Sequence, residues 1–280
     1  MNYESAKKIC VEKLTPEFGI VEAKSITRIL FEDFFNYYTT EKDLDDFGVE
    51  NQNHLFYFIE KVIQGFPIQY LTNSAYFWGR KFYVNSDVLI PRFETEELVE
   101  WIKLEVSKRN YIHSIIDIGT GSGCIPITLK LLFPNIEISA LDISESALKI
   151  AAKNADTFKS EINFIHGDIL SNIIFEKKFD IIVSNPPYIQ EEEQVKMDKS
   201  VIDHEPKIAL FVANNQPLIF YDSILNFAHN HLSDNGLIFV EINEFYANET
   251  VKLFEEKKYI ATLKYDIQNK PRMIMAYKPN

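Results

Sequence analysis

The tetrapeptide Asn185-Pro186-Pro187-Tyr188 has residue types that suit a binding site for a planar polar group. It follows the apolar run Phe179–Ser184, which predicts a buried strand, so it should lie at a strand's carboxyl end, where open α/β sheets bind ligands. The prolines lack N–H groups, Asn185 adds a side-chain carbonyl, and Tyr188 adds a flat ring. Such a segment suits an amide or the exocyclic amine of a base. A proline-stiffened structural loop is the alternative.

A glycine turn follows a second predicted strand. The apolar run at 113–118 leads into Gly119-Thr120-Gly121-Ser122-Gly123, and an apolar helical stretch follows. Glycines permit positive φ and close approach of a ligand, and N–H groups at the helix start can meet a carboxylate or another polar ligand edge. The next predicted strand ends in Asp142, whose carboxylate can accept hydrogen bonds from both ribose hydroxyls. The two features together predict a nucleoside-containing ligand.

The spacing of the glycines separates two classes of cofactor. A dinucleotide fingerprint, G-x-G-x-x-G, would place glycine at position 124, but this position is Cys124 and the spacing is G-x-G-x-G. A pyrophosphate-bearing cofactor is therefore disfavoured. S-adenosylmethionine contains a ribose and a carboxylate but no phosphate, so it fits a loop that has no lysine or arginine.

With the glycine turn, the acidic strand end and the tetrapeptide in this order, the chain resembles the class I S-adenosylmethionine-dependent methyltransferases that modify nitrogen. More closely, it is similar to the HemK/PrmC family, the release-factor glutamine methyltransferases. Further matches are Phe77-Trp78, Val88-Leu89-Ile90-Pro91-Arg92, Glu94-Thr95-Glu96, Glu205-Pro206 and the segment 266–272. The similarity runs from about residue 65 to the C-terminus, and less distinctly through the N-terminal helices. Phe93 stands where the family usually has proline, which bears on the local turn more than on activity.

The resemblance implies methyl transfer to N5 of the glutamine in the Gly-Gly-Gln motif of peptide chain release factors. From the turn and the resemblance, the candidate cofactor-binding residues are Gly119, Thr120, Gly121, Ser122, Gly123, Asp142, Asp168, Ile169 and Asn185. Asp168 and Ile169 are implied to lie beside the adenine, with a turn or helix-capping role for Asp168 as the alternative. The candidate substrate-binding residues are Asn185, Pro186, Pro187 and Tyr188.

The proposed catalytic residues are Asn185, Pro186 and Tyr188. Methyl transfer from a sulfonium is an in-line displacement, so the enzyme mainly has to hold the nucleophile about 3–3.5 Å from the methyl carbon. An amide nitrogen is a poor nucleophile because its lone pair is shared with the carbonyl. Two acceptors, Asn185 Oδ1 and the Pro186 carbonyl, would draw the N–H bonds out of conjugation, while Tyr188 packs on the amide face.

Three further residues have weaker assignments. Arg92 is expected to form a structural ion pair with Glu94 or Glu96, although it could also orient the substrate or hold a loop over the cofactor. Glu205 and the proline after it read as an ordinary loop, which by the resemblance closes the rim of the site.

Composition narrows the possible classes of protein. The 280 residues are 46% hydrophobic, 25% charged and 14% aromatic, which indicates a folded globular protein rather than a disordered chain. The net charge of −12 disfavours an extended nucleic-acid footprint. Cys10 and Cys124 are far apart, and no Cys/His cluster has metal-ligand spacing, so neither disulfides nor a bound metal are expected. No signal peptide or membrane span is evident, which favours the cytoplasm.

The expected fold is α/β, with a class I methyltransferase (Rossmann-like) doubly wound sheet, an antiparallel C-terminal strand and a small helical N-terminal domain. The expected domains are 1–73, helical and by resemblance substrate-recognising; 74–90, a connector with a β-hairpin at 80–89; and 91–280, catalytic. Helix breaks are expected at Thr15-Pro16 and Gly48. Helices are expected near 94–108, 122–133, 145–157, 216–231 and 245–257, and strands near 114–118, 136–141, 161–165, 179–184, 236–242, 260–267 and 272–277.

Four classes of function compete at this point. A protein glutamine methyltransferase explains the tetrapeptide, the glycine turn, the acidic charge and the family segments together. An N-methyltransferase acting on adenine or guanine in DNA or RNA is the second choice, because the same acceptors can hold a flipped-out exocyclic amine. The glycine spacing disfavours an NAD-dependent dehydrogenase. Retention of the expected site residues disfavours a non-catalytic binding module.

Overall fold

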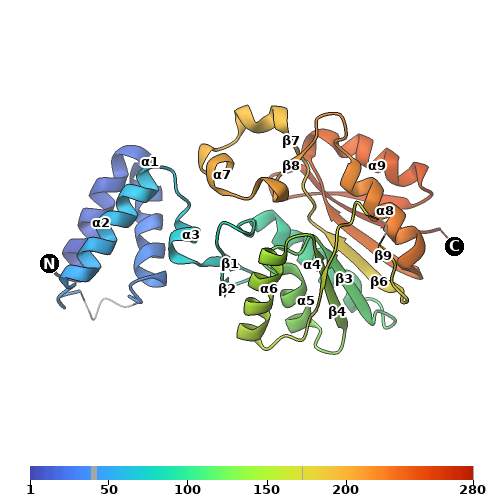
Figure 1. Cartoon of the computed structure of the whole chain (residues 1–280), viewed down its shortest axis with the longest axis horizontal. Helices are drawn as coiled ribbons and strands as arrows, with labels where there is room; N and C mark the ends of the chain where they lie inside the picture. Colours follow the sequence, from blue (N-terminus) through green and yellow to red (C-terminus); the bar gives the residue numbers. More distant parts are fainter. Residues whose placement is uncertain (39–42, 172, 280) are drawn as a thin grey trace. The chain divides into compact units, whose positions relative to one another are not determined.

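The computed structural model describes residues 1–38, 43–171 and 173–279, which form two compact units (Figure 1). Unit 1 comprises Met1–Ser74 and Asp198–His204, and unit 2 comprises Ala75–Met197 and Glu205–Asn280. The functional division into 1–73, 74–90 and 91–280 stays a prediction. Among the described residues, no helix combines the length and the apolarity that crossing a bilayer requires.

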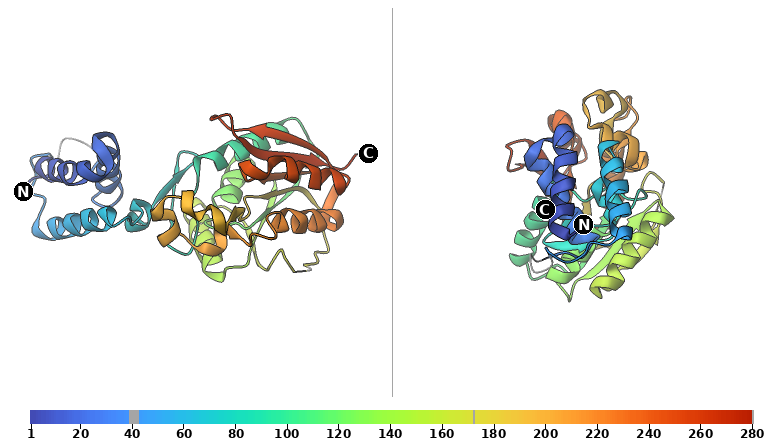
Figure 2. Two further views of the ribbon diagram at one scale, coloured as in Figure 1. Left: turned by 90° about the horizontal axis from the view of Figure 1, so that it is seen from above. Right: turned by 90° about the vertical axis from the view of Figure 1, so that its left-hand side faces the viewer.

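Unit 1 is helical, with α1 at Tyr3–Asp33, α2 at Val49–Ile63, α3 at Ile68–Thr72 and α7 at Lys199–His204. The helices α1 and α2 pack side by side (Figure 2) over a core that includes Cys10, Leu14, Phe31, Phe47 and Leu55. Gly48 is the N-cap of α2, so the break expected there is confirmed.

The break expected at Thr15-Pro16 is wrong by a few residues. Pro16 lies inside α1, and the backbone leaves helical geometry at Gly19, where φ is 75° and ψ is 163°. Proline removes one hydrogen bond within the helix, whereas only glycine reaches this φ at little steric cost. The chain therefore kinks at the residue that adopts the unusual backbone conformation most easily.

Unit 2 contains a seven-stranded sheet with the order β10-β11-β9-β6-β3-β4-β5. The strands are β3 Ser114–Ile118, β4 Glu137–Asp142, β5 Asn163–His166, β6 Phe179–Ser184, β9 Leu232–Glu241, β10 Ile260–Tyr265 and β11 Pro271–Tyr277. From β5 to β9 all neighbours are parallel, and β11 is antiparallel to both β9 and β10. The doubly wound sheet with antiparallel final strands is confirmed.

Helices cover both faces of this sheet (Figure 1). One face packs against α4 Phe93–Ser107, α5 Cys124–Leu132 and α6 Glu145–Phe158, and the other packs against α8 Ile219–His231 and α9 Ala247–Glu256. Successive strand residues alternate between the two cores: Ile181 and Val183 face the first, and Ile182 faces the second. Burial on both faces explains why the sequence shows these strands as continuous apolar runs.

The register of the central strands determines where the site forms. Ile118, the last residue of β3, lies opposite Leu141 of β4 on one side and Ser184 of β6 on the other. The Ser184 hydroxyl donates to the Ile118 carbonyl at 2.7 Å. The glycine turn, Asp142 and the tetrapeptide therefore start side by side at the carboxyl edge of the sheet.

The predicted hairpin at 80–89 is wrong in position. The hairpin pairs β1 Ala75–Phe77 with β2 Arg80–Phe82, and its turn residues Trp78 and Gly79 have φ of 53° and 68°. Two positive φ values define a turn that usually contains Asn-Gly, so tryptophan at the first position gave no signal. Asn85 instead closes a local turn, accepting a hydrogen bond from the Asp87 N–H at 2.9 Å. Smaller elements are β7 Ile189–Gln190, β8 Phe211–Val212, η2 Glu191–Lys196, η3 Lys207–Ala209 and η4 Glu244–Tyr246.

Candidate active site

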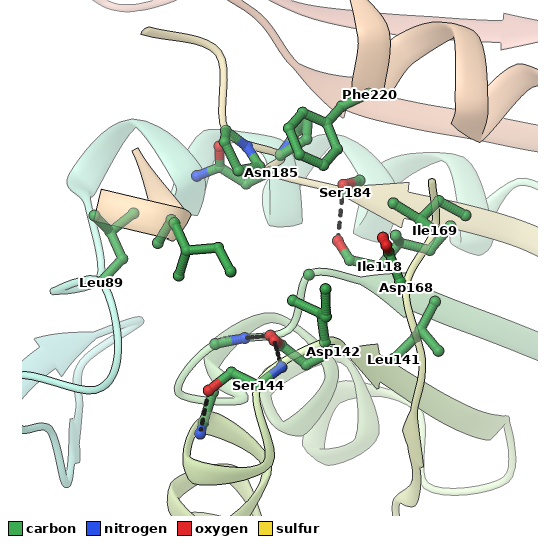
Figure 3. Close-up of a pocket in the computed structure, with 18 of the residues that line it drawn as sticks. Leu89, Ile118, Leu141, Asp142, Ser144, Asp168, Ile169, Ser184, Asn185 and Phe220 are labelled. Atoms are coloured by element: carbon green, nitrogen blue, oxygen red, sulfur yellow. Dashed lines mark hydrogen bonds between the residues drawn. The ribbon is translucent and has the colours of Figure 1, made fainter. Parts of the chain in front are cut away.

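A cavity with about 990 Å³ of space, including its open mouth, lies at the carboxyl edge of the sheet. The loops that follow β3, β4, β5 and β6 form its walls. Asp142 and Asn185 lie on opposite sides of this cavity, as Figure 3 shows. Of the candidate site residues, those that line it are Gly119, Gly121, Asp142, Asp168, Ile169, Asn185, Pro186 and Pro187.

The Asp142 carboxylate is fixed by backbone groups on both of its oxygens. Oδ2 accepts from the Gly121 N–H at 2.8 Å, and Oδ1 accepts from the Ser144 N–H at 2.9 Å. Burial raises the pKa of Asp142, and these two N–H groups offset part of that increase. Because a carboxylate oxygen can accept more than one hydrogen bond, both oxygens retain capacity for ligand hydroxyls.

Several N–H groups of the glycine turn donate to carbonyls of the protein itself, so fewer of them are available to a ligand than the sequence suggests. The Gly119 and Thr120 N–H groups donate to the Leu141 carbonyl, and the Gly123 N–H donates to the Thr120 carbonyl. Gly123 has φ of 77°, and a Cβ there would lie 3.0 Å from Ile127 Cδ1. Gly123 therefore allows the positive φ of this turn and lets α5 pack closely behind it.

Thr120 and Ser122 are buried and do not line the cavity. The Ser122 carbonyl accepts a hydrogen bond from Asn154 Nδ2 at 2.9 Å, which ties the turn to α6. Thr120 and Ser122 therefore stabilise the turn from within the protein and do not face the cavity.

The loop after β5 supplies an apolar wall. Ile169 and Leu170 line the cavity together with Leu141 and Ile143. Asp168 Oδ1 accepts from the Leu170 N–H at 2.9 Å, a turn-stabilising contact of the kind expected as the alternative role for this residue. These apolar side chains suit a flat apolar ring.

The tetrapeptide divides between the cavity and the protein interior. Asn185, Pro186 and Pro187 line the cavity, and Asn185 Nδ2 donates to Thr95 Oγ1 at 3.0 Å. Tyr188 is not among the lining residues: its hydroxyl donates to Glu241 Oε1 at 3.0 Å, and its ring packs against the α8 side of the core.

Arg92 pairs with Glu205, so the expected pairing with Glu94 or Glu96 is wrong. The distance from Arg92 Nη2 to Glu205 Oε1 is 2.7 Å, and Glu205 Oε2 accepts from the Ile90 N–H at 3.2 Å. The Glu205 side chain is only 1% exposed, whereas Glu94 and Glu96 occupy the first turn of α4. Glu94 and Glu96 are half-buried, and Glu96 Oε1 accepts instead from the Trp78 N–H at 2.9 Å. No local pattern links Arg92 to Glu205, which lies 113 positions further along the chain.

The Arg92–Glu205 pair joins two segments that line the cavity. One segment contributes Asp87, Val88 and Leu89, and the other contributes Ile208 and Ala209; Phe220 and Ile224 complete this part of the wall. The family-like motif at 88–92 includes part of the first segment, and the motif Glu205-Pro206 precedes the second.

Asp117 is a further residue that the sequence patterns did not identify as part of the site. It is fully buried in β3, and neither carboxylate oxygen has a hydrogen-bond partner among the described residues. Burial raises the pKa of Asp117 to about 7, and the nearby Asp142 carboxylate adds to the effect. The sequence feature that points to Asp117 is an aspartate within an otherwise apolar predicted strand.

The charge of the cavity fits S-adenosylmethionine. Its described lining contains the carboxylates of Asp87, Asp142 and Asp168 and no lysine or arginine. A phosphate group would find no cationic side chain there, whereas a sulfonium or ammonium group would be attracted.

Comparison with known proteins agrees with this geometry. Residues 85–208 match the methyltransferase small domain family. A methyltransferase of known structure from Pyrococcus furiosus superimposes with a TM-score of 0.52 and 17% identity over 83% of this chain and 100% of that chain. This similarity confirms the fold.

Two relatives share much more of the sequence. A release factor glutamine methyltransferase from Flavobacterium psychrophilum is 46% identical over 211 residues, covering 74% of each chain. A release factor glutamine methyltransferase from Lactococcus lactis is 45% identical over 217 residues, covering 77% of this chain and 78% of that one. The chain therefore belongs to the release factor glutamine methyltransferase family of S-adenosylmethionine-dependent enzymes.

Proposed function

We propose that this protein transfers the methyl group of S-adenosylmethionine to N5 of the glutamine in the Gly-Gly-Gln motif of peptide chain release factors. The observation that carries this proposal is that Asn185 lies across the cavity from Asp142 and that Pro186 lines the same cavity. That cavity offers acceptors for an amide on one side and a ribose-binding carboxylate on the other.

The cofactor supplies an electrophilic methyl group on a sulfonium. Asp142 accepts hydrogen bonds from the ribose hydroxyls, and Leu141, Ile143, Ile169 and Leu170 enclose the adenine. Asp168 borders the same end of the cavity. Closely packed apolar walls exclude water, which strengthens every polar contact inside.

The substrate amide has two N–H bonds and needs two acceptors. Asn185 Oδ1 and the Pro186 carbonyl oxygen accept them, draw the nitrogen lone pair out of conjugation and aim it at the methyl carbon. Because Tyr188 is held by Glu241, it contributes by fixing the loop that carries these acceptors. A strong general base is not required at this step, since the proton leaves after transfer.

The partner is a protein with an accessible glycine-flanked glutamine. Such a segment enters a narrow site that a glutamine inside a helix or strand cannot reach. Unit 1 supplies a separate recognition surface, and the reaction takes place in the cytoplasm, where translation terminates. The net charge of −12 argues against nucleic acid as the substrate.

A label-transfer assay tests this proposal. The enzyme is incubated with methyl-labelled S-adenosylmethionine and, in separate reactions, a release factor, the same factor with Gln→Ala in its Gly-Gly-Gln motif, duplex DNA and ribosomal RNA. We expect label only in the unmodified factor. Label in a nucleic acid and in neither factor would assign the protein to the base-modifying class instead.

A further inference from the structure

We propose that Glu241 and Thr95 are positioning residues that orient the Asn185 amide so that its carbonyl oxygen, rather than its NH2 group, faces the methyl acceptor. We call these three residues the amide-orienting network. The inference rests on the proposed function, because it concerns how the same site holds the substrate amide.

The network joins three separate elements through buried hydrogen bonds. Thr95, in the first turn of α4, is 2% exposed, and Glu241, the last residue of β9, is 1% exposed. The Thr95 hydroxyl donates to Glu241 Oε2 at 2.7 Å and accepts from Asn185 Nδ2 at 3.0 Å. No water is needed to complete the connection from the carboxylate to the asparagine.

The direction of these bonds follows from the number of hydrogens available. A hydroxyl has one hydrogen, and the Thr95 hydroxyl gives it to Glu241, since a carboxylate can only accept. Toward Asn185 the hydroxyl therefore presents only lone pairs. The Asn185 NH2 group must face Thr95, because the reversed amide would bring two acceptors together. Oδ1 is left at the other end of the amide, available to the substrate.

Both Glu241 oxygens accept hydrogen bonds from neighbouring hydroxyls. The Tyr188 hydroxyl donates to Oε1 at 3.0 Å, so both carboxylate oxygens accept from a hydroxyl. Burial raises the pKa of Glu241 above its ordinary value and Glu94 adds to the increase, while the hydrogen bonds from Thr95 and Tyr188 and the charge of Arg272 offset part of it. Arg272 is itself held at 3.1 Å from Asp266. The carboxylate thus fixes two residues of the tetrapeptide at once.

Amide orientation matters because the acceptor nitrogen presents donors. With Oδ1 forward, Asn185 meets an N–H of the substrate glutamine. With NH2 forward, two donors would face each other, and the nucleophilic nitrogen would lose one of its two acceptors. The energetic effect is expected in the transition state more than in cofactor binding, because Asn185 touches the reacting amide.

The test compares Thr95→Val, which has a similar shape but no hydroxyl, with Thr95→Ser, which keeps the hydroxyl. For Thr95→Val we expect kcat to fall roughly 10- to 100-fold with the KM for the release factor and the Kd for S-adenosylmethionine near those of the wild type. Thr95→Ser should restore most of kcat. Equal kcat in the two variants would overturn the network. So would parallel losses of kcat, cofactor affinity and thermal stability in Thr95→Val, since these indicate a structural role alone.

A second readout does not depend on activity. In the ¹⁵N–¹H spectrum, one Asn185 side-chain proton, assigned by its absence in Asn185→Ala, should exchange slowly in the wild type and Thr95→Ser and rapidly in Thr95→Val. If the wild type fails to methylate glutamine, the proposed function fails, and this signal alone decides the network. Identical exchange in all three proteins overturns it.

Discussion

At the scale of single residues, the site depends on carboxylates whose surroundings differ. Asp142 is held by two backbone N–H groups and faces the cavity, whereas Asp117, in the neighbouring strand, is buried with no partner among the described residues. One is arranged to accept hydrogen bonds from a ligand. The other carries an electrostatic cost within the fold.

Removing the Asp142 carboxylate should weaken cofactor binding. Each charge-assisted hydrogen bond lost from the ribose costs roughly 1.5–3 kcal/mol, so Asp142→Ala should raise the Kd for S-adenosylmethionine at least tenfold in calorimetry. Asp142→Asn, which keeps one acceptor oxygen, should show a smaller effect. A wild-type Kd in the alanine variant would remove Asp142 from the binding site.

Asp117 should make stability fall as pH rises. Its folded pKa of about 7 lies above the ordinary aspartate value, so between these pH values the folded protein holds a proton that the unfolded chain has released. The free energy of unfolding therefore decreases across this window and levels off above it. Asp117→Asn removes the titration, so its stability relative to the wild type should rise by roughly 3 kcal/mol from pH 5 to pH 8. Urea unfolding at the two pH values measures the difference. Parallel pH profiles for the two proteins would contradict the assignment.

The residue-scale contacts could not be read from the sequence. Thr95 lies in a family-like motif, but Glu241 is 146 positions away and no local pattern links the two residues. The residues that follow strands could be predicted, because parallel strands bring their carboxyl ends to one edge. Side-chain partners from distant elements could not.

At the scale of elements, the strands that are buried on both faces could be predicted most accurately from the sequence. The strands β3, β4 and β6 were predicted within a residue of their bounds because a strand covered on both faces is an uninterrupted apolar run. The β1–β2 hairpin was misplaced because Trp78 occupies a positive-φ turn position. The break in α1 was expected at Pro16, but the helix continues through this proline and the backbone leaves helical geometry at Gly19.

The ion pair between Arg92 and Glu205 leads to a prediction about how two segments of the cavity wall are held together. It joins the segment before α4 to the one that leads into η3, and both segments line the cavity. Glu205→Gln leaves Arg92 without its charged partner but retains an acceptor for the Ile90 N–H. We expect a lower Tm and a Kd for S-adenosylmethionine raised roughly 3- to 30-fold, with faster cofactor release.

The matched control for that variant is Glu191→Gln, an exposed residue of η2 that undergoes the same chemical change. The two variants should differ clearly in stopped-flow release of the cofactor. Equal release rates would show that the Arg92–Glu205 pair does not hold the cavity wall.

At the scale of the whole molecule, the α/β unit has all the chemistry assigned here. Unit 1 has a core of its own, built largely from aromatic and aliphatic side chains, and none of its described residues is among those that line the cavity. A site for a single glutamine side chain offers few contacts, so discrimination between protein substrates requires surface beyond it. The acidic net charge is compatible with a protein substrate and gives nucleic acid little attraction.

The most direct measurement of the central claim is mass-spectrometric mapping of the methyl group after reaction with a release factor. The account predicts one added methyl on N5 of the Gly-Gly-Gln glutamine. Asn185→Ala should abolish it while cofactor binding persists, and Asn235→Ala, at an exposed position near the opposite end of the sheet, should not. A methyl group found on another residue, or an undiminished rate with Asn185→Ala, would contradict the account.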